Sequence, residues 1–214
     1  MVDRQRIIDL TLTIDAEMRG AQIQAARTIA VDGWNATTLS LYSHCGTHMD
    51  APKHFIEGAA SIDQQSLDVC CGPAKVLDLT PVEPRELLTV ARLAPWADRI
   101  KSGDRLLFRT DWYQRLGTDS YRNQLPRLSL DLAHWLVERK VAMIGVEPPS
   151  VADVNEMREL TDVHQALFRG GIVIVEGLAY LDRLRQDEID FIALPLKVAD
   201  GDGSPVRAIA IERE

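Results

Sequence analysis

The sequence predicts a mixed α/β fold in a single domain over residues 1–214, with strands predominating near the functional site and about three helices outside them. Short apolar and β-branched runs recur along the chain, and at least two segments carry apolar residues at helical spacing. A chain of 214 residues suits one sizeable core, because about 70% of the unfolded surface is buried at this size. No linker or repeat divides it.

Strands are predicted where apolar or alternating runs are bounded by turn residues. The run from Thr37 to Tyr42 alternates most strictly and leads into a histidine-rich stretch. A predicted hairpin joins residues 189–196 to 205–211, and we interpret the acidic Asp200-Gly201-Asp202 between them as a turn rather than a calcium loop. The other predicted strands are 7–12, 74–79, 105–109, 141–146 and 172–176.

Helices are predicted in three places. Pro84 should begin one over residues 85–88, because proline is favoured in a first turn. Ser129 caps a second helix, in which Leu132, Trp135 and Leu136 define one buried face and His134 falls off it, as a surface histidine would. The third precedes the stop at Gly170 and Gly171.

A metal site is indicated by three of the five histidines, which lie within eleven residues together with one carboxylate: His44, His48, Asp50 and His54. Nitrogen and carboxylate donors at short, irregular spacing suit a borderline divalent metal. A straight strand would hold His44 and His48 roughly 13 Å apart, and Gly46 disfavours a helix. The stretch therefore predicts a bent loop hinged at Gly46, and a polar loop with solvated histidines is the alternative.

The third predicted helix and the strand after it add two further candidates. His164 shares a helix face with Leu167 and Phe168, so its ring should point into the interior. Glu176 ends a run of four β-branched residues that reads as a buried strand. Burying an unpaired carboxylate costs several kcal/mol or shifts its pKa, so Glu176 needs either a metal or a cationic side chain.

The motif resembles the signature of the cyclase-type metal hydrolases, which include bacterial kynurenine formamidase and isatin hydrolase: His44-x-Gly46-Thr47-His48-x-Asp50-x-Pro52-x-His54. The resemblance implies that His44, His48 and Asp50 bind one metal, that Asp50 bridges to a second metal, and that His54 is the catalytic acid/base. The family also carries a histidine and a glutamate spaced like His164 and Glu176, which implies that both bind metal. It further implies a small barrel-like sheet with outer helices, the swivelling β/β/α fold, and a homodimer or homotetramer.

Amide hydrolysis follows as the expected chemistry, because a catalytic zinc site lowers the pKa of bound water to about 7 and paired ions polarise a carbonyl. His54 would carry the proton to the leaving nitrogen. Zinc is the first choice, with one or two ions per subunit, and manganese is the alternative. A closed structural site, or a non-catalytic metal-dependent binding module, is the rival to an enzyme.

The expected substrate is a small aryl amide, with N-formylkynurenine implied first and a cyclic amide such as isatin as the alternative. Family members with formamidase activity carry an aromatic-Pro-Gly-Asp element near the N-terminus, and residues 17–22 contain nothing similar. Trp112 and Tyr113 could form an aromatic wall or a lid packed on the core. At Glu147 the family often has aspartate, so the added methylene alters any hydrogen bond made there.

Composition excludes several other classes. The formal charge of −8 disfavours nucleic acid and anionic membranes as partners. Residues 1–6 are polar and give no sign of a signal peptide or membrane span, so a cytoplasmic location is expected. Three cysteines, an odd number that includes the adjacent Cys70 and Cys71, are expected to be buried thiols. Cys45 should point away from the metal.

Overall fold

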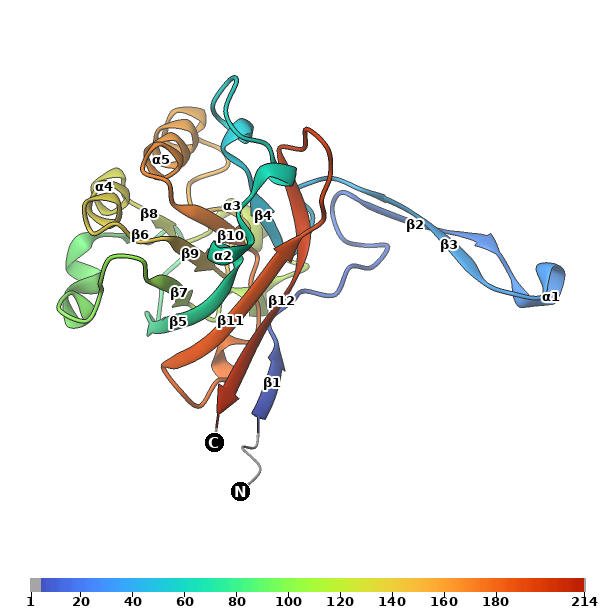
Figure 1. Ribbon diagram of the computed structural model, residues 1–214, viewed down its shortest axis with the longest axis horizontal. Helices are drawn as coiled ribbons and strands as arrows, with labels where there is room; N and C mark the ends of the chain where they lie inside the picture. Colours follow the sequence, from blue (N-terminus) through green and yellow to red (C-terminus); the bar gives the residue numbers. More distant parts are fainter. Residues whose placement is uncertain (1–4, 214) are drawn as a thin grey trace.

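The computed structural model describes residues 5–213 and shows a mixed α/β fold built around one eight-stranded sheet (Figure 1). Residues 1–4, on which part of the expectation about a leader segment depends, lie outside the described residues. The sheet order is β1-β12-β11-β5-β7-β9-β10-β4, with strands β1 (Gln5–Asp9), β4 (His48–Asp50), β5 (Cys71–Asp78), β7 (Arg105–Arg109), β9 (Met143–Val146), β10 (Val173–Glu176), β11 (Glu188–Pro195) and β12 (Gly203–Arg213).

The sheet closes into a barrel of seven strands because β12 pairs with β4 as well as with β11, which leaves only β1 outside. Strands β5, β7, β9 and β10 run parallel to one another, whereas β11, β12 and β4 are joined by antiparallel pairings. Buried and less buried residues alternate along most of β12, as expected for a strand with one face inside a barrel. The predicted fold class and the barrel-like sheet are both confirmed.

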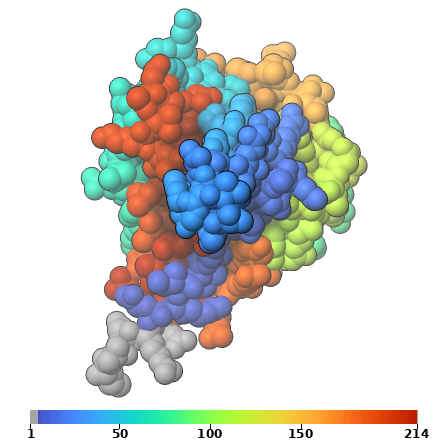
Figure 2. Space-filling model, turned by 90° about the vertical axis from the view of Figure 1, so that its right-hand side faces the viewer, coloured from blue at the N-terminus to red at the C-terminus, as the bar shows by residue number. Residues whose placement is uncertain are grey.

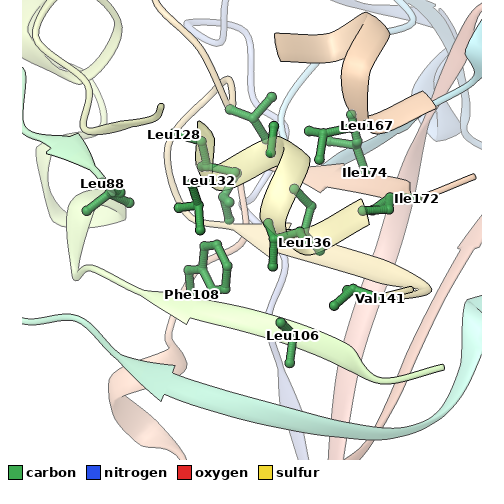
Figure 3. Packing of buried hydrophobic residues seen from close by; sticks show 14 of the residues in the cluster. Leu88, Leu106, Phe108, Leu128, Leu132, Leu136, Val141, Leu167, Ile172 and Ile174 are labelled. Atoms are coloured by element: carbon green, nitrogen blue, oxygen red, sulfur yellow. The ribbon is translucent and has the colours of Figure 1, made fainter. Parts of the chain in front are cut away.

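Helices α4 (Leu130–Glu138) and α5 (Met157–Arg169) cover the outer face of β7, β9 and β10 (Figure 3). Leu106 and Phe108 of β7 pack with these helices, whereas Leu107 belongs to the cluster inside the barrel. Because successive side chains of a strand point to opposite faces, these strands contribute residues both to the cluster under the helices and to the cluster inside the barrel. The predicted cap is also present, since the Ser129 hydroxyl accepts the Leu132 N–H at 3.1 Å, and His134 is exposed as predicted.

The prediction of a helix after Pro84 is wrong. Arg85 adopts a φ of 62°, which a right-handed helix does not allow, and β6 (Leu87–Leu88) instead pairs in parallel with β8 (Arg127–Leu128). Leu88 is buried by that pairing, and the gain outweighs the weak helix preference of so short a segment. The chain turns helical only in η3 (Val90–Trp96), a 3₁₀ segment.

Residues 21–41 form an arm that projects far from the barrel (Figure 1), and Figure 2 views the molecule from the side of the arm, with the arm in front. Its strands β2 (Ala21–Arg27) and β3 (Ala36–Leu41) pair only with each other, and α1 (Ile29–Asp32) sits at the tip. The strand predicted from Thr37 is therefore present, but it belongs to the arm and not to the barrel. The β-branched run from Thr28 to Val31 leads into the short helix at the tip.

The remaining elements are short. They are η1 (Pro52–His54), η2 (Ile62–Gln64), α2 (Leu67–Cys70), η4 (Trp112–Arg115), α3 (Asp119–Asn123) and η5 (Leu181–Arg183). Among residues 5–213, no helix has the length and apolar character needed to cross a bilayer. All three cysteines are free, with Cys45 and Cys70 buried.

Candidate metal centre

The histidine motif folds as a bent connection between the arm and the barrel. Gly46 has a φ of 63°, and it meets a second glycine, Gly177, so closely that a Cβ on Gly177 would lie 2.5 Å from the Gly46 carbonyl oxygen. Thr47 anchors the bend by donating its hydroxyl to the Gly177 carbonyl at 2.5 Å. The bend brings the rings of His44 and His48 to 5.1 Å between centroids, far less than a straight strand would allow.

Strand β4 then places two donors on the outer side of the barrel. Met49 belongs to the cluster inside the barrel, so by alternation His48 and Asp50 face outward towards α5. On the neighbouring strand β10, Ile174 packs with the helices, and Glu176 lies two residues further along the same face. Glu176 is the ladder partner of His48, and 3.3 Å separates Glu176 Oε2 from His48 Nε2.

His164 reaches the same space from α5. Its Nε2 lies 3.3 Å from Glu176 Oε1 and 3.6 Å from Asp50 Oδ2. Its Nδ1 donates to the Leu160 carbonyl at 2.7 Å, and His48 Nδ1 donates to the Gly46 carbonyl at 2.9 Å. Because a carbonyl only accepts, both rings carry a proton on Nδ1, and their neutral forms would direct an Nε2 lone pair at the carboxylates.

Asp50 lies between two groups of donors. Its Oδ1 is 2.7 Å from His44 Nδ1 and 3.4 Å from His48 Nε2, whereas its Oδ2 faces His164. Asp50 Oδ2 is buried and has no hydrogen-bond partner among the described residues. Three sets of donor atoms each lie within 4.8 Å of one another among the described residues: two share Asp50, His44-His48-Asp50 and Asp50-His164-Glu176, and the third is His44-His54-Asp202. The donor chemistry and the unpartnered carboxylate oxygen both fit a divalent metal ion.

His54 lies beside this cluster, at the end of η1. Its ring stacks on His44 with 3.8 Å between centroids, and its side chain remains 25% exposed. Phe55 follows it and stacks on His164 at 4.2 Å. The structure thus brings all six residues singled out in the sequence into one place, with His54 nearest to solvent and the others buried or nearly so.

Comparisons with known proteins identify the family. The model of the family described as "Putative cyclase" matches residues 8–153. A kynurenine formamidase from Bacillus cereus is 34% identical over 175 residues, which cover 82% of this chain and 79% of that protein. The chain belongs to the cyclase family.

Solved structures extend the likeness to almost the whole chain. Isatin hydrolase A from Ralstonia solanacearum superposes with a TM-score of 0.86 at 28% identity, over 97% of this chain and 92% of that one. A structure described as a potential metal-dependent hydrolase with cyclase activity gives a TM-score of 0.81 at 26% identity, over 99% and 100%. The predicted class, a metal-dependent hydrolase acting on a small molecule, is confirmed, and a non-catalytic binding module is not favoured.

At the candidate metal centre, neighbouring histidines compensate the negative charge of the buried carboxylates. Burial lowers the pKa of His44, but hydrogen bonds to Asp50 and Asp202 outweigh it and raise that pKa to about 9. Burial is likewise outweighed at His48 and His164, where the hydrogen bond to Glu176 raises each pKa. The pKa of Glu176 is held well below its usual range despite its burial, by the same two histidines. Protons therefore balance the carboxylates, and a divalent cation would replace them on binding.

One carboxylate at the candidate metal centre, that of Asp202, is not predicted from the sequence. Asp202 lies 3.0 Å from His44 Nε2 and 3.5 Å from His54 Nδ1, although we had interpreted its segment as a turn in the scaffold. The only local signal is an aspartate between two glycines at the end of a hairpin loop, and such a pattern is common in ordinary turns.

Two further residues singled out in the sequence, Trp112 for an aromatic wall and Glu147 for a supporting hydrogen bond, are buried. Trp112 is 1% exposed and donates its Nε1–H to the Tyr121 carbonyl at 2.8 Å, so it packs in the core and cannot form a substrate wall. Glu147 is fully buried, and its Oε2 accepts the N–H and hydroxyl of Thr110 at 2.7 and 3.1 Å. The other oxygen, Oε1, has no partner among the described residues.

Proposed function

We propose that this protein hydrolyses the amide bond of a small aryl substrate, with N-formylkynurenine, cleaved to kynurenine and formate, as the first candidate. The observation that carries the proposal is the convergence of His44, His48, Asp50, His164 and Glu176 on one buried space, with His54 beside it. The similarity to a kynurenine formamidase over 82% of the chain supports the substrate.

The donor geometry suits two zinc ions that share Asp50. His44, His48 and Asp50 would hold one, and Asp50, His164 and Glu176 the other, because Asp50 Oδ1 faces the first pair of histidines and Oδ2 faces His164. When bound, zinc supplies an activated water and a polarised substrate carbonyl. Manganese is the alternative, since nitrogen and oxygen donors suit both metals.

The chain's own contribution to the reaction is orientation and proton transfer. The Nδ1–H bonds to Leu160 and Gly46 hold His164 and His48 in the tautomer that offers Nε2 inward. Burial lowers the pKa of His54, so the ring is neutral near pH 7 and can take up a proton and pass it to the leaving nitrogen. Phe55, stacked on His164, covers one side of the site with an apolar face.

A cyclic amide is the second candidate substrate. It is favoured by the likeness to isatin hydrolase A over 97% of the chain and by the absence of an aromatic-Pro-Gly-Asp element in residues 17–22. Ring opening of a lactam would use the same metal donors and the same proton transfer by His54.

The deciding experiment measures kcat/KM for N-formylkynurenine beside isatin and several simple lactams, on zinc-loaded protein. A formamidase should reach the common enzyme range of about 10⁴–10⁸ M⁻¹s⁻¹. A value for N-formylkynurenine below about 10³ M⁻¹s⁻¹ with faster turnover of isatin would transfer the assignment to lactam hydrolysis. Tightly bound metal with no turnover of any substrate would contradict the hydrolase proposal.

Self-association is part of the same proposal. The arm exposes several large apolar side chains, among them Val31 at 85% and Trp34 at 58%. A two-stranded hairpin is only marginally stable in water, so an arm of this kind gains stability when its apolar side chains are covered. We propose a homodimer or homotetramer in which a second copy covers the arm, and we retain the cytoplasmic location as a prediction.

A further inference from the structure

Asp202 lies in the loop directly before β12, and the barrel fixes the position of that loop. In the β12–β4 ladder, Gly203 is the partner of Asp50, which sets the residue before it beside the metal donors. The Asp202 carbonyl accepts the Ala51 N–H at 2.9 Å, and the Gly201 carbonyl accepts the Ile62 N–H at 2.8 Å. The loop that carries Asp202 is therefore tied by backbone hydrogen bonds to the residue directly after β4 and to the first residue of η2.

The side chain of Asp202 contacts two histidines at once. Its Oδ2 lies 3.0 Å from His44 Nε2 and 3.5 Å from His54 Nδ1, and the two rings are stacked with 26° between their planes. The Ser43 side chain also hydrogen bonds to this carboxylate. Gly203 makes the arrangement possible, because a Cβ there would lie 2.7 Å from His44 Cε1.

The carboxylate can only accept, so the proton it receives must be on His44 Nε2. The second nitrogen of that ring, Nδ1, is the one that faces Asp50 Oδ1 at 2.7 Å and belongs to the donor set. On His54 the contact is through Nδ1, which leaves Nε2 as the nitrogen available for exchange with a substrate. Asp50 Oδ1 is also an acceptor, so His44 carries a proton on each nitrogen in this structure, and a metal ion would displace the Nδ1 proton while Asp202 retains the one on Nε2. At His54 the 3.5 Å contact turns Nδ1 towards the same oxygen.

We propose that Asp202 is a positioning residue of the metal centre, which directs His44 Nδ1 to the metal and holds His54 stacked in place for proton transfer. This inference rests on the proposed function. Asp202 is 42% exposed, so its role is not that of a buried structural anion whose removal would unfold the chain.

The same loop provides a matched control. Asp200 is two residues away and of the same type, but it pairs with Lys53, and its side chain is 84% exposed. It has no contact with either histidine in the described structure. Replacing Asp200 therefore changes the charge of the loop by the same amount without altering the contact to His44 or His54.

The experiment compares Asp202→Ala, Asp202→Asn and Asp200→Ala, using competition with a chromophoric chelator to measure zinc affinity. Loss of an outer partner of a metal ligand costs about 10–100-fold in affinity or activity, and we expect that loss of zinc affinity for Asp202→Ala. The amide oxygen of Asp202→Asn can still accept from His44, so we expect its zinc affinity to stay within about tenfold of wild type. Asp200→Ala should match wild type.

Kinetics at saturating zinc separate positioning from metal loss. We expect Asp202→Ala to lower kcat by about 10–100-fold while KM changes little, because the defect lies in the proton-transfer geometry of His54. If Asp202→Ala binds zinc and turns over substrate like Asp200→Ala, the inference is overturned while the proposed function stands. Should Asp202→Ala not fold, Asp202→Ser takes its place, because its short hydroxyl cannot span the distance to His44.

The two hypotheses fail in different ways. The zinc measurement needs no substrate, so a wild-type protein that binds zinc but hydrolyses none of the amides would remove the proposed function and leave Asp202 to be judged by affinity alone. A wild-type protein that binds no zinc would remove both.

Discussion

Glu176 and His48 are ladder partners on adjacent strands, and their side chains meet at 3.3 Å on the outer side of the barrel. The Glu176 side chain has a second task there, since its Oε1 accepts the Val151 N–H at 2.8 Å. A buried carboxylate with both oxygens engaged in this way is fixed before any metal arrives. The centre is preorganised by the sheet itself.

Replacing Glu176 by glutamine should therefore separate charge from shape. The amide keeps an acceptor for Val151 but removes the negative charge and the carboxylate donor, so we expect zinc affinity to fall by more than the roughly 10–100-fold typical of an outer partner. Isothermal titration with zinc measures it. Glu188→Gln, at an exposed residue of β11, is the matched control, and equal affinities for the two variants would exclude Glu176 as a ligand.

His54→Ala should leave the zinc content near that of wild type and lower kcat by roughly 10²–10⁴, the usual worth of a positioned acid or base. The reason is that His54 stacks on the donor His44 but lies outside the two donor sets that share Asp50. Elemental analysis and steady-state kinetics on the same preparation test both statements. His134→Ala, on the exposed face of α4, serves as control, and a loss of zinc in His54→Ala would make His54 a ligand.

Zinc should stabilise the folded protein. The donors come from β4, β10, α5 and the bend before β4, and a ligand that binds only the native state adds about 2.7 kcal/mol at a hundred times its Kd. We expect Tm to fall when a chelator removes the metal and to recover on addition of zinc. The His164→Ala variant should show a much smaller recovery, and an identical Tm with and without chelator would count against metal binding in the native state.

Glu147 should make stability depend on pH. Burial raises the pKa of its carboxyl from 4.5 to about 7, so the folded chain holds a proton there that the unfolded chain releases. This lowers the free energy of unfolding as pH rises from 4.5 to about 7, by roughly 3 kcal/mol in total, and has no effect below that window. Glu147→Gln, which keeps an acceptor for Thr110, should therefore gain stability relative to wild type between pH 5 and 8. Urea unfolding of metal-free protein measures the difference, and parallel curves for the two proteins would refute it.

Charges on the arm should break the proposed oligomer. Val31→Glu and Trp34→Glu place a carboxylate among the exposed apolar side chains at the tip of the arm, where burial against a second copy would be costly. We expect sedimentation to show a lower mass for both variants than for wild type. Met157→Glu is the control, because Met157 is an exposed apolar residue of α5, away from the arm. A wild-type protein that sediments as a monomer at micromolar concentration would remove the proposal.

Much of the candidate centre was predictable because its residues carry local signals. Gly46 and the alternating His48 and Asp50 define a bend from spacing alone, and Glu176 stands out as an acid at the end of a β-branched run. His164 is found by its place on an apolar helix face, and the structure buries it as predicted.

What escaped prediction depends on contacts distant in sequence. Asp202 reaches His44 only because β12 pairs with β4 at Gly203, and no short pattern encodes that register. Arg85 adopts its left-handed conformation because the chain must meet β8, forty residues later. Trp112 was ambiguous for a different reason, since a loop aromatic reads alike whether it lines a pocket or, as here, donates its indole N–H to a nearby carbonyl in the core.

Strand β4 has only three residues, and each of its neighbours in the barrel comes from the last quarter of the chain, β10 and β12. During synthesis, the histidines of the motif leave the ribosome long before the strands that orient them. The barrel cannot close at this seam until residue 205 has been made. We therefore expect metal binding to follow the synthesis of β12, because a nascent chain stalled before that strand would present its early histidines without the closed seam that orients them.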